Sequence, residues 1–286
     1  MTAPADAAPP VRPPTALPPP TGWPADWYPD PYGAPVLRYF DGRRWTYRVV
    51  APRRQAEPHP TLPIVTAFGA LGILLASLVA SRYLLEYLVR FDWPIVVYVA
   101  IAAIVGYGPS VWWCVYATGR WSRGDRIDAL GMRLRWSDLG WGPVTWLAAL
   151  AVEIVVAVLI EVLNIPLTGN TEGIGNFDRD RTYIISLLIV AVVAAPIVEE
   201  MVFRGLVLRG FRSRLPAVAA VGLQGFLFGL AHVDPVRGTG NIGLVLVLGA
   251  VGATFGGAAY LLRRIGPTIV AHALFNGFVM IIVLTT

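Results

Sequence analysis

The chain has 286 residues, of which 56% are hydrophobic and 14% are charged. Soluble globular domains carry roughly 25% charged residues, so this composition excludes an ordinary soluble protein and indicates a polytopic membrane protein. The net charge of +5 comes from arginines alone, and they lie between apolar segments rather than in one patch, which argues against a nucleic-acid-binding surface. The single cysteine, Cys114, excludes an intrachain disulfide framework.

Composition divides the chain into four parts. Residues 1–21 are rich in proline and alanine and are predicted to form a disordered tail, without a basic-then-apolar signal peptide. Residues 22–50 form a small module, and residues 51–61 form a basic, proline-containing linker. Residues 62–286 form the membrane domain, so we expect its first transmembrane segment to act as the insertion signal.

The module at 22–50 is predicted to be a β-hairpin. Asp41-Gly42 lies between aromatic and β-branched residues, which is a strong signal for a two-residue turn. A module of fewer than about 40 residues buries little surface, so aromatic side chains must supply its core. We expect the core to contain Trp27, Tyr28, Tyr39 and Trp45, with Leu37 and Tyr39 on one strand facing Trp45 and Tyr47 on the other.

Two motifs in this module indicate its family. The sequences W-Y-P-D-P at 27–31 and R-Y-F-D-G-R-R-W-T at 38–46 resemble a short N-terminal domain of unknown function found in actinobacterial membrane proteins. Phe40 stands where that domain usually has a tryptophan. The resemblance implies no activity; we expect a packing or docking module, with the binding of a protein partner as the alternative.

Hydropathy predicts seven transmembrane segments after the linker, each close to the roughly 20 residues that cross a bilayer. Their bounds are Leu62–Leu85, Trp93–Thr118, Trp141–Leu163, Tyr183–Phe203, Leu215–Ala231, Ile242–Leu262 and Pro267–Leu284. Glycine and alanine recur in the sixth segment, which predicts a close helix-packing face. The predicted fold is therefore an all-α polytopic membrane protein of about seven helices with a small N-terminal β module.

The arginines predict the orientation of these segments. Of the 23 arginines, 18 lie on the side of the N-terminus and five on the other side. The positive-inside rule then places the N-terminus and its module in the cytoplasm and the C-terminus outside the cell membrane.

The stretch P-I-V-E-E-M-V-F-R at 196–204 places three ionisable side chains inside the fourth segment. Each costs about 2.5 to 3.5 kcal/mol at the bilayer centre, so together they need partners, water or a function. Glu200 and Arg204 lie four residues apart and can pair on one helical face. That pairing leaves Glu199 unexplained, because it lies about 100° around the helix from Glu200.

Two of the three histidines lie in later segments, His232 in F-G-L-A-H and His272 in H-A-L-F-N. A single histidine on an apolar helix is more often a hydrogen-bonded core residue than a catalyst. Here, however, His272 has Asn276 one turn away, and both are neutral hydrogen-bond donors that can stabilise an oxyanion.

These residues suit hydrolysis by an activated water. Glu199 would take a proton from a water oriented by His232, while His272 and Asn276 receive the developing negative charge. No nucleophile competes for the role, because Cys114 has no acid or base near it in sequence and G-x-S-x-G is absent. Two histidines and a glutamate can also bind zinc, so a divalent metal held by Glu199, His232 and His272 stays an alternative to a reaction that requires no cofactor.

The three motifs E-E-x-x-x-R, F-x-x-x-H and H-x-x-x-N, in this order at 199–204, 228–232 and 272–276, resemble those of the CAAX protease and bacteriocin-processing family of intramembrane proteases related to the Rce1-type endopeptidase. The resemblance extends from about Asp128 to the C-terminus and is densest over 183–286. It implies an intramembrane endopeptidase acting on a membrane peptide or protein in the lipid bilayer. It also implies catalytic roles for Glu199, His232, His272 and Asn276, with Glu200 and Arg204 as supporting residues.

Two other functions remain open from the sequence. A family member without activity could bind a peptide or partner as an immunity or scaffold protein. Glu153 and Glu161, nearly on one face of the third segment, also resemble the carboxylates of a proton-coupled transporter. The protease interpretation has a geometric requirement, because His232 lies roughly 25 Å along its segment and His272 roughly 8 Å along its own. Either the helices are tilted or broken, or a loop at Arg209–Pro216 dips into the protein.

Overall fold

A computed structural model describes residues 22–50, 62–122, 124–169 and 181–285 of the chain. They belong to two units, Met1–His59 and Pro60–Thr286, each with its own internal packing. The predicted tail at 1–21 and the linker at 51–61 lie outside the described residues.

The N-terminal module is a three-stranded antiparallel sheet in the order β1-β2-β3, with β1 at Asp26–Pro29, β2 at Leu37–Phe40 and β3 at Trp45–Val50. Phe40 is its central core residue, 1% exposed, and its ring lies 5.2 Å from that of Trp45. Asp30 is also buried and forms an ion pair with Arg38. The aromatic core is therefore present, but it is centred on a residue that the predicted cluster omitted.

The turn between β2 and β3 differs from the predicted two-residue hairpin. Phe40 pairs with Trp45, so four residues connect the strands. The reason is the Asp41 side chain, whose Oδ1 accepts hydrogen bonds from the backbone N–H groups of Arg43 and Arg44, both at 2.8 Å. An irregularity between Arg38 and Phe40 also shifts the register, so that Leu37 faces Val50 instead of the predicted partners.

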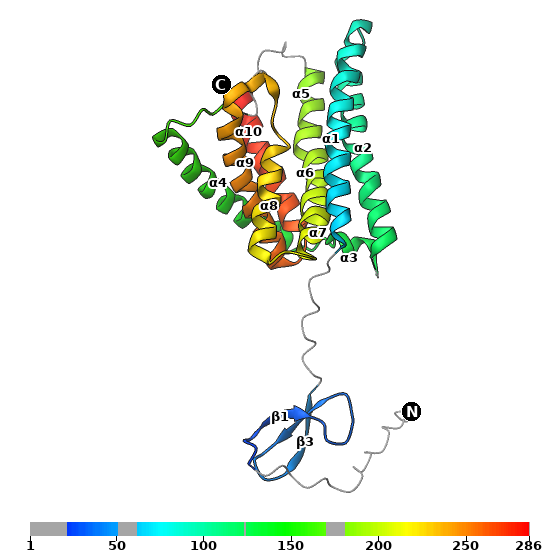
Figure 1. Ribbon diagram of the computed structural model, residues 1–286, viewed down its shortest axis with the longest axis vertical. Helices are drawn as coiled ribbons and strands as arrows, with labels where there is room; N and C mark the ends of the chain where they lie inside the picture. Colours follow the sequence, from blue (N-terminus) through cyan, green and yellow to red (C-terminus); the bar gives the residue numbers. More distant parts are fainter. Residues whose placement is uncertain (1–21, 51–61, 123, 170–180, 286) are drawn as a thin grey trace, which may run out of the picture. The chain divides into compact units, whose positions relative to one another are not determined.

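The second unit is entirely helical (Figure 1). In chain order its helices are α1 (Ile64–Leu88), η1 (Val89–Phe91), α2 (Ile95–Trp121), α3 (Arg126–Leu130), α4 (Asp138–Val162), α5 (Arg181–Leu188), η3 (Ile189–Ala194), α6 (Ala195–Glu200), η4 (Met201–Val207), α7 (Leu208–Arg212), α8 (Ala217–Leu230), η5 (Pro235–Gly240), α9 (Asn241–Leu262) and α10 (Gly266–Thr285). Residues 181–212 form one continuous helical stretch from α5 to α7.

Six helical stretches among the described residues are long and apolar enough to cross a membrane. They correspond to six of the seven predicted segments. The fifth segment is shorter than predicted, because α8 has only 14 residues and ends at Leu230. His232 therefore lies just beyond the end of a helix rather than within it.

The stretch that carries the glutamates is not a regular α-helix. It contains two π-helical segments, η3 before Pro196 and η4 after Glu200. Proline has no backbone N–H and so removes a donor from the helix ladder. In η3 the N–H of Ala195 bonds the carbonyl of Val190, five residues back, and Pro196 leaves the next carbonyl, that of Ala191, without a helical donor.

Helices α8 and α9 pack with their backbones in close contact. A Cβ atom on Gly229 would lie 2.5 Å from the carbonyl oxygen of Val245, and one on Gly225 would lie 2.6 Å from the backbone nitrogen of Ala253. On α9, Gly249, Gly252 and Gly256 face α8, whereas Gly257 has no described neighbour there. The small-residue face predicted in the sixth segment therefore packs against the helix that leads to His232.

Candidate functional site

Glu199 lies near the end of α6, and the two oxygens of its carboxylate have different surroundings. Oε1 accepts a hydrogen bond of 3.2 Å from the hydroxyl of Tyr107 on α2. Oε2 is buried and has no hydrogen-bond partner among the described residues. The side chain is 14% exposed. The hydroxyl therefore fixes one oxygen and leaves the other directed at the two histidines.

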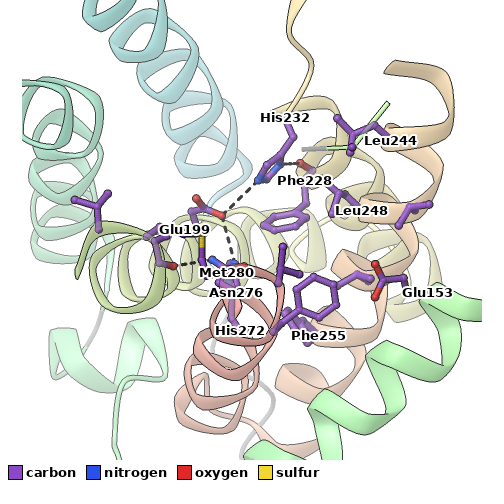
Figure 2. Close-up of a pocket in the computed structure, with 18 of the residues that line it drawn as sticks. Glu153, Glu199, Phe228, His232, Leu244, Leu248, Phe255, His272, Asn276 and Met280 are labelled. Carbon is purple, nitrogen blue, oxygen red and sulfur yellow. Dashed lines mark hydrogen bonds and ion pairs between the residues drawn. The ribbon is translucent and has the colours of Figure 1, made fainter. Parts of the chain in front are cut away.

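His232 approaches this free oxygen from the end of α8. Its Nδ1 bonds the backbone carbonyl of Phe228 at 2.8 Å, and its Nε2 lies 3.9 Å from Oε2 of Glu199 (Figure 2). A carbonyl oxygen only accepts, so Nδ1 must carry the proton of a neutral ring. Nε2 then presents a lone pair towards the carboxylate. The end of α8 at Leu230 makes this contact possible, because the chain turns there towards α6.

His272 approaches the same oxygen from the first turns of α10. Its Nε2 lies 3.8 Å from Oε2 of Glu199, and its Nδ1 lies 3.1 Å from Oε1 of Glu200. An ionised Glu200 accepts the Nδ1 proton, so a neutral His272 also presents a bare Nε2. The ring donates from Nε2 only when it is protonated.

Three lone-pair atoms thus converge on one small volume: Oε2 of Glu199 and the Nε2 atoms of His232 and His272. Atoms that only accept do not bond to one another, and separations of 3.8 and 3.9 Å exceed a hydrogen bond. The arrangement needs a proton donor or a cation among them, and water has two protons to donate.

Glu200 and Arg204 form a fully buried ion pair behind this point. Nη1 of Arg204 donates to Oε1 of Glu200 at 2.7 Å, and Nη2 donates to the carbonyl of Gly252 on α9 at 2.9 Å. The same carbonyl accepts from Nε2 of Gln224 on α8 at 2.8 Å. The guanidinium also lies over the ring of Phe228 at 4.6 Å. This network connects the helix of the glutamates with α8 and α9 and holds Glu200 against His272.

Asn276 lies one turn beyond His272 on α10. Its Nδ2 donates to the carbonyl of Ala191 at 2.7 Å, the carbonyl that Pro196 leaves without a helical donor. One of its two amide protons is therefore used for structure, and the second is left for a ligand.

A cavity of about 460 Å³ opens onto these groups. Its polar lining residues are Tyr107, Glu153, Glu199, His232, His272 and Asn276. The rest of its wall is mainly apolar and comes from α4, α9, α10 and the stretch 181–200. All four predicted catalytic residues therefore line one cavity, whereas the supporting pair Glu200 and Arg204 lies outside it.

The same residues can be tested as a zinc site. Two imidazole nitrogens and a carboxylate oxygen are suitable zinc donors, but in a tetrahedral site they would lie about 3.3 Å apart, given bonds of about 2.0–2.1 Å. The separations here are 3.8 and 3.9 Å. Among the described residues, no group of three or more histidine, cysteine, aspartate or glutamate side chains is arranged to hold a metal ion. The donor types fit zinc, and their spacing does not.

Three polar residues of this region carried no catalytic role in the sequence analysis. Tyr107 lies 92 residues before Glu199, and no motif in the sequence indicates that the two side chains pair. Gln224 lies in the apolar fifth segment, and a lone amide in such a segment is a signal that could have predicted a buried polar contact. Glu153 was noted only as a transporter-like carboxylate, yet it lines the same cavity as Glu199.

Comparison with known families supports both resemblances predicted from the motifs. Residues 181–278 match the family described as type II CAAX prenyl endopeptidase Rce1-like, and residues 25–59 match a domain of unknown function, DUF2510. The first match includes all six predicted site residues and is shorter than the expected resemblance from Asp128 onward. No curated protein and no solved structure matches the chain. Together with its apolar helices, the first match identifies a multi-pass membrane protein with a protease-family segment.

Proposed function

Since the chain carries an Rce1-like CAAX protease segment over residues 181–278, we propose that it is an intramembrane endopeptidase that hydrolyses a peptide bond with a glutamate-activated water. The observation that supports this most strongly is the convergence of three lone-pair atoms from α6, α8 and α10 at the wall of a cavity large enough for a peptide segment.

In this mechanism the water lies between Glu199 and the two histidines. It donates one proton to Oε2 of Glu199, and the Nε2 lone pair of His232 orients it by accepting the other. As the water oxygen bonds to the peptide carbonyl carbon, the first proton passes to the carboxylate. Tyr107 keeps Oε1 occupied, so that the base that reacts is the oxygen facing the water.

The tetrahedral intermediate then carries negative charge on the former carbonyl oxygen. The second amide proton of Asn276 is available to this oxyanion, and His272 becomes a second donor once its Nε2 has taken up a proton from the medium. Glu200 supports the protonated form of His272 by accepting from Nδ1. Glu199 finally returns its proton to the leaving amine, which breaks the carbon–nitrogen bond and restores the carboxylate.

A metal-dependent version would use the same three residues as ligands. Glu199, His232 and His272 would hold a zinc ion, which would polarise the carbonyl and activate the water. Their spacing does not fit such an ion, so no step above depends on one. Metal analysis of the purified protein and of Glu199→Gln, together with activity after chelation, separates the two versions.

The cavity and the apolar helices indicate the setting of the reaction. The substrate would be a membrane peptide or membrane protein, reached from within the lipid bilayer. With the N-terminus in the cytoplasm and the C-terminus outside, the DUF2510 segment would be free to bind a cytoplasmic protein partner.

The test is cleavage of a library of fluorogenic membrane peptides by purified protein in lipid nanodiscs. Glu199→Gln should lower kcat by about 10²- to 10⁴-fold, the usual contribution of a general base. Glu161→Gln is the matched control, because Glu161 is an exposed residue of α4 that does not line the cavity. Full activity of Glu199→Gln would refute the proposed base.

The non-catalytic alternative makes a different prediction in the same assay. A protein that only binds peptides would retain them in wild type and Glu199→Gln alike and would release no product from either. Product formation by wild type that is absent in Glu199→Gln excludes it.

A further inference from the structure

Glu153 is a second carboxylate in the cavity wall, and the proposed mechanism does not use it. It lies on α4, outside the Rce1-like segment, and it lines the cavity together with Ala157 one turn later. In Figure 2 its carboxylate lies on the far side of the drawn residues from Glu199, with Phe228 and Phe255 between them in that view. The two acids thus belong to different parts of the same cavity.

Glu153 has no cationic partner within the part of the chain that the structure describes. It forms no hydrogen bond or ion pair with any other residue that the structure describes. The sequence has no lysine, and no arginine occurs among the described residues that line the cavity. Arg204, the buried arginine beside the glutamates of α6, is 1% exposed and is already bonded to Glu200 and Gly252.

A carboxylate in this position is costly without a partner. An acidic side chain near the bilayer centre costs a few kcal/mol, and such residues usually face a bundle interior or a cavity and pair with a cation. Of the polar residues that line the cavity with Glu153, Glu199 has the same charge, and none of those described forms a hydrogen bond or ion pair with Glu153. A partner must therefore come from what enters the cavity.

The neighbouring wall restricts the chemistry of that partner. Leu248, Val251, Phe255 and Val279 supply an apolar surface from α9 and α10. A small hydrated cation would gain nothing from this surface. A lysine or arginine side chain would bury its methylene stem against it and direct its charged group at Glu153.

We propose that Glu153 forms a specificity subsite for a lysine or arginine side chain of the substrate. The inference rests on the proposed peptidase function and deepens it, because it names the class of substrate residue that the cavity selects. Glu153 does not touch the reacting atoms in this proposal; it positions the peptide by holding one side chain.

The first experiment measures cleavage by the full-length protein in nanodiscs. A peptide that wild type cleaves is varied at each position with arginine, lysine, norleucine and glutamate. At one position, arginine and lysine should raise kcat/KM at least about tenfold over norleucine, mainly through KM, since a charged hydrogen bond contributes about 1.5–3 kcal/mol. Glu153→Gln should abolish this preference and leave the norleucine peptide within about twofold.

Two further variants decide whether charge is the cause. Glu153→Arg should reverse the preference at the same position, so that the glutamate peptide becomes the better substrate. Glu161→Gln on the same helix should leave the preference unchanged. A cationic preference that survives in Glu153→Gln, or no preference at any position in wild type, would overturn the subsite.

A binding arm separates this proposal from the proposed function. Fluorescent arginine and norleucine peptides are titrated against Glu199→Gln and against Glu199→Gln combined with Glu153→Gln. If Glu199→Gln alone binds the arginine peptide more tightly than the norleucine peptide, the subsite is supported. If wild type also cleaves no peptide, the peptidase function is rejected while the subsite is retained. Equal binding of both peptides by both variants would reject the subsite whatever the cleavage result.

Discussion

At the scale of single residues, the site depends on the different surroundings of the two carboxylate oxygens of Glu199. A free carboxylate can rotate and offer either oxygen to the water. The hydroxyl of Tyr107 holds Oε1 and so directs Oε2 at His232 and His272. Tyr107 is therefore a positioning residue, and its effect on the reaction passes through Glu199.

Tyr107→Phe removes this hydroxyl and keeps the ring. We expect kcat to fall by about tenfold or more with little change in KM, because the carboxylate loses a hydrogen bond but the peptide surface of the cavity is unchanged. Stopped-time cleavage of the peptide library by variant and wild type measures both constants.

Tyr116→Phe is the matched control for this change, since it lies on the same helix and is exposed. It should retain wild-type kcat and KM. An equal loss of kcat in both variants would show a general effect on α2 and contradict the positioning role.

The residue scale also shows where sequence reasoning ends. Short motifs whose spacing matches a helical turn predicted four site residues: Glu199, His232, His272 and Asn276. Tyr107 and Glu153 reach the same cavity from helices far away in the sequence, and neither lies in a motif. Only the packing of α2 and α4 against the motif-bearing helices reveals them.

At the scale of elements, the two histidines do lie level, because both Nε2 atoms lie within 3.9 Å of Oε2 of Glu199. The irregular helix is the one that carries Glu199, whereas α8 and α10 are α-helices. The sequence predicted tilted or broken helices, or a loop at Arg209–Pro216 that dips into the protein, and it did not predict the π-helical segments on either side of 195–200. The apolar pattern does not show where the α-helix changes to a π-helix. Hydrophobic residues before Pro196 and after Glu200 suit both kinds of helix equally. The end of α8 at Leu230, by contrast, lies within one residue of the predicted end of the fifth segment at Ala231.

The contact between α8 and α9 sets the position of His232, which gives a prediction at this scale. Gly229→Ala adds a Cβ atom 2.5 Å from the carbonyl oxygen of Val245, so the helices must separate. We expect a lower unfolding temperature and a large loss of cleavage. Unfolding is measured with a thiol-reactive dye, because Cys114 is fully buried and reacts only when the fold opens.

Gly222→Ala makes the same chemical change on the same helix with no atom within 4 Å of the new Cβ. It should keep the unfolding temperature and activity of wild type. If Gly229→Ala matched this control in both measurements, the close packing would have no part in holding His232.

The β module offers a pH prediction. Burial raises the pKa of Asp30, but the hydrogen bond and charge of Arg38 and the backbone hydrogen bonds of Ala34 and Tyr32 together outweigh burial, so the pKa lies below its ordinary value. A carboxyl group with a lowered folded-state pKa stabilises the fold above its unfolded pKa, and this stabilisation is lost as pH falls through the folded pKa. The module should therefore lose stability in acid.

A fluorinated phenylalanine at Phe40 in the full-length protein reports this loss as a change in its ¹⁹F signal, because Phe40 is the core residue of the module. Urea titrations at several pH values should give a lower midpoint in acid for wild type. In Asp30→Asn the midpoint should be lower at neutral pH and should depend less on pH. A pH dependence in Asp30→Asn as steep as in wild type would contradict the role of this ion pair.

At the scale of the whole molecule, charge and helix direction give the orientation. Figure 1 shows α3 and α7, which carry Arg126, Arg209 and Arg212, at the end of the helical unit where α1 begins. The final helix, α10, starts near that end and finishes at the opposite one. From these positions the positive-inside rule predicts that the start of α1 lies at the cytoplasmic face and Thr285 at the external face.

Single-cysteine labelling in intact cells tests this orientation. Wild type supplies the background, because its only cysteine, Cys114, is fully buried and should not react with a membrane-impermeant maleimide. Gly124→Cys adds a thiol in open space between α2 and α3, and Thr285→Cys adds one at the exposed end of α10. We expect Thr285→Cys to react in intact cells and Gly124→Cys only after permeabilisation, since impermeant reagents reach the external face alone. The reverse pattern would place the module outside the cell and remove the basis for a cytoplasmic partner.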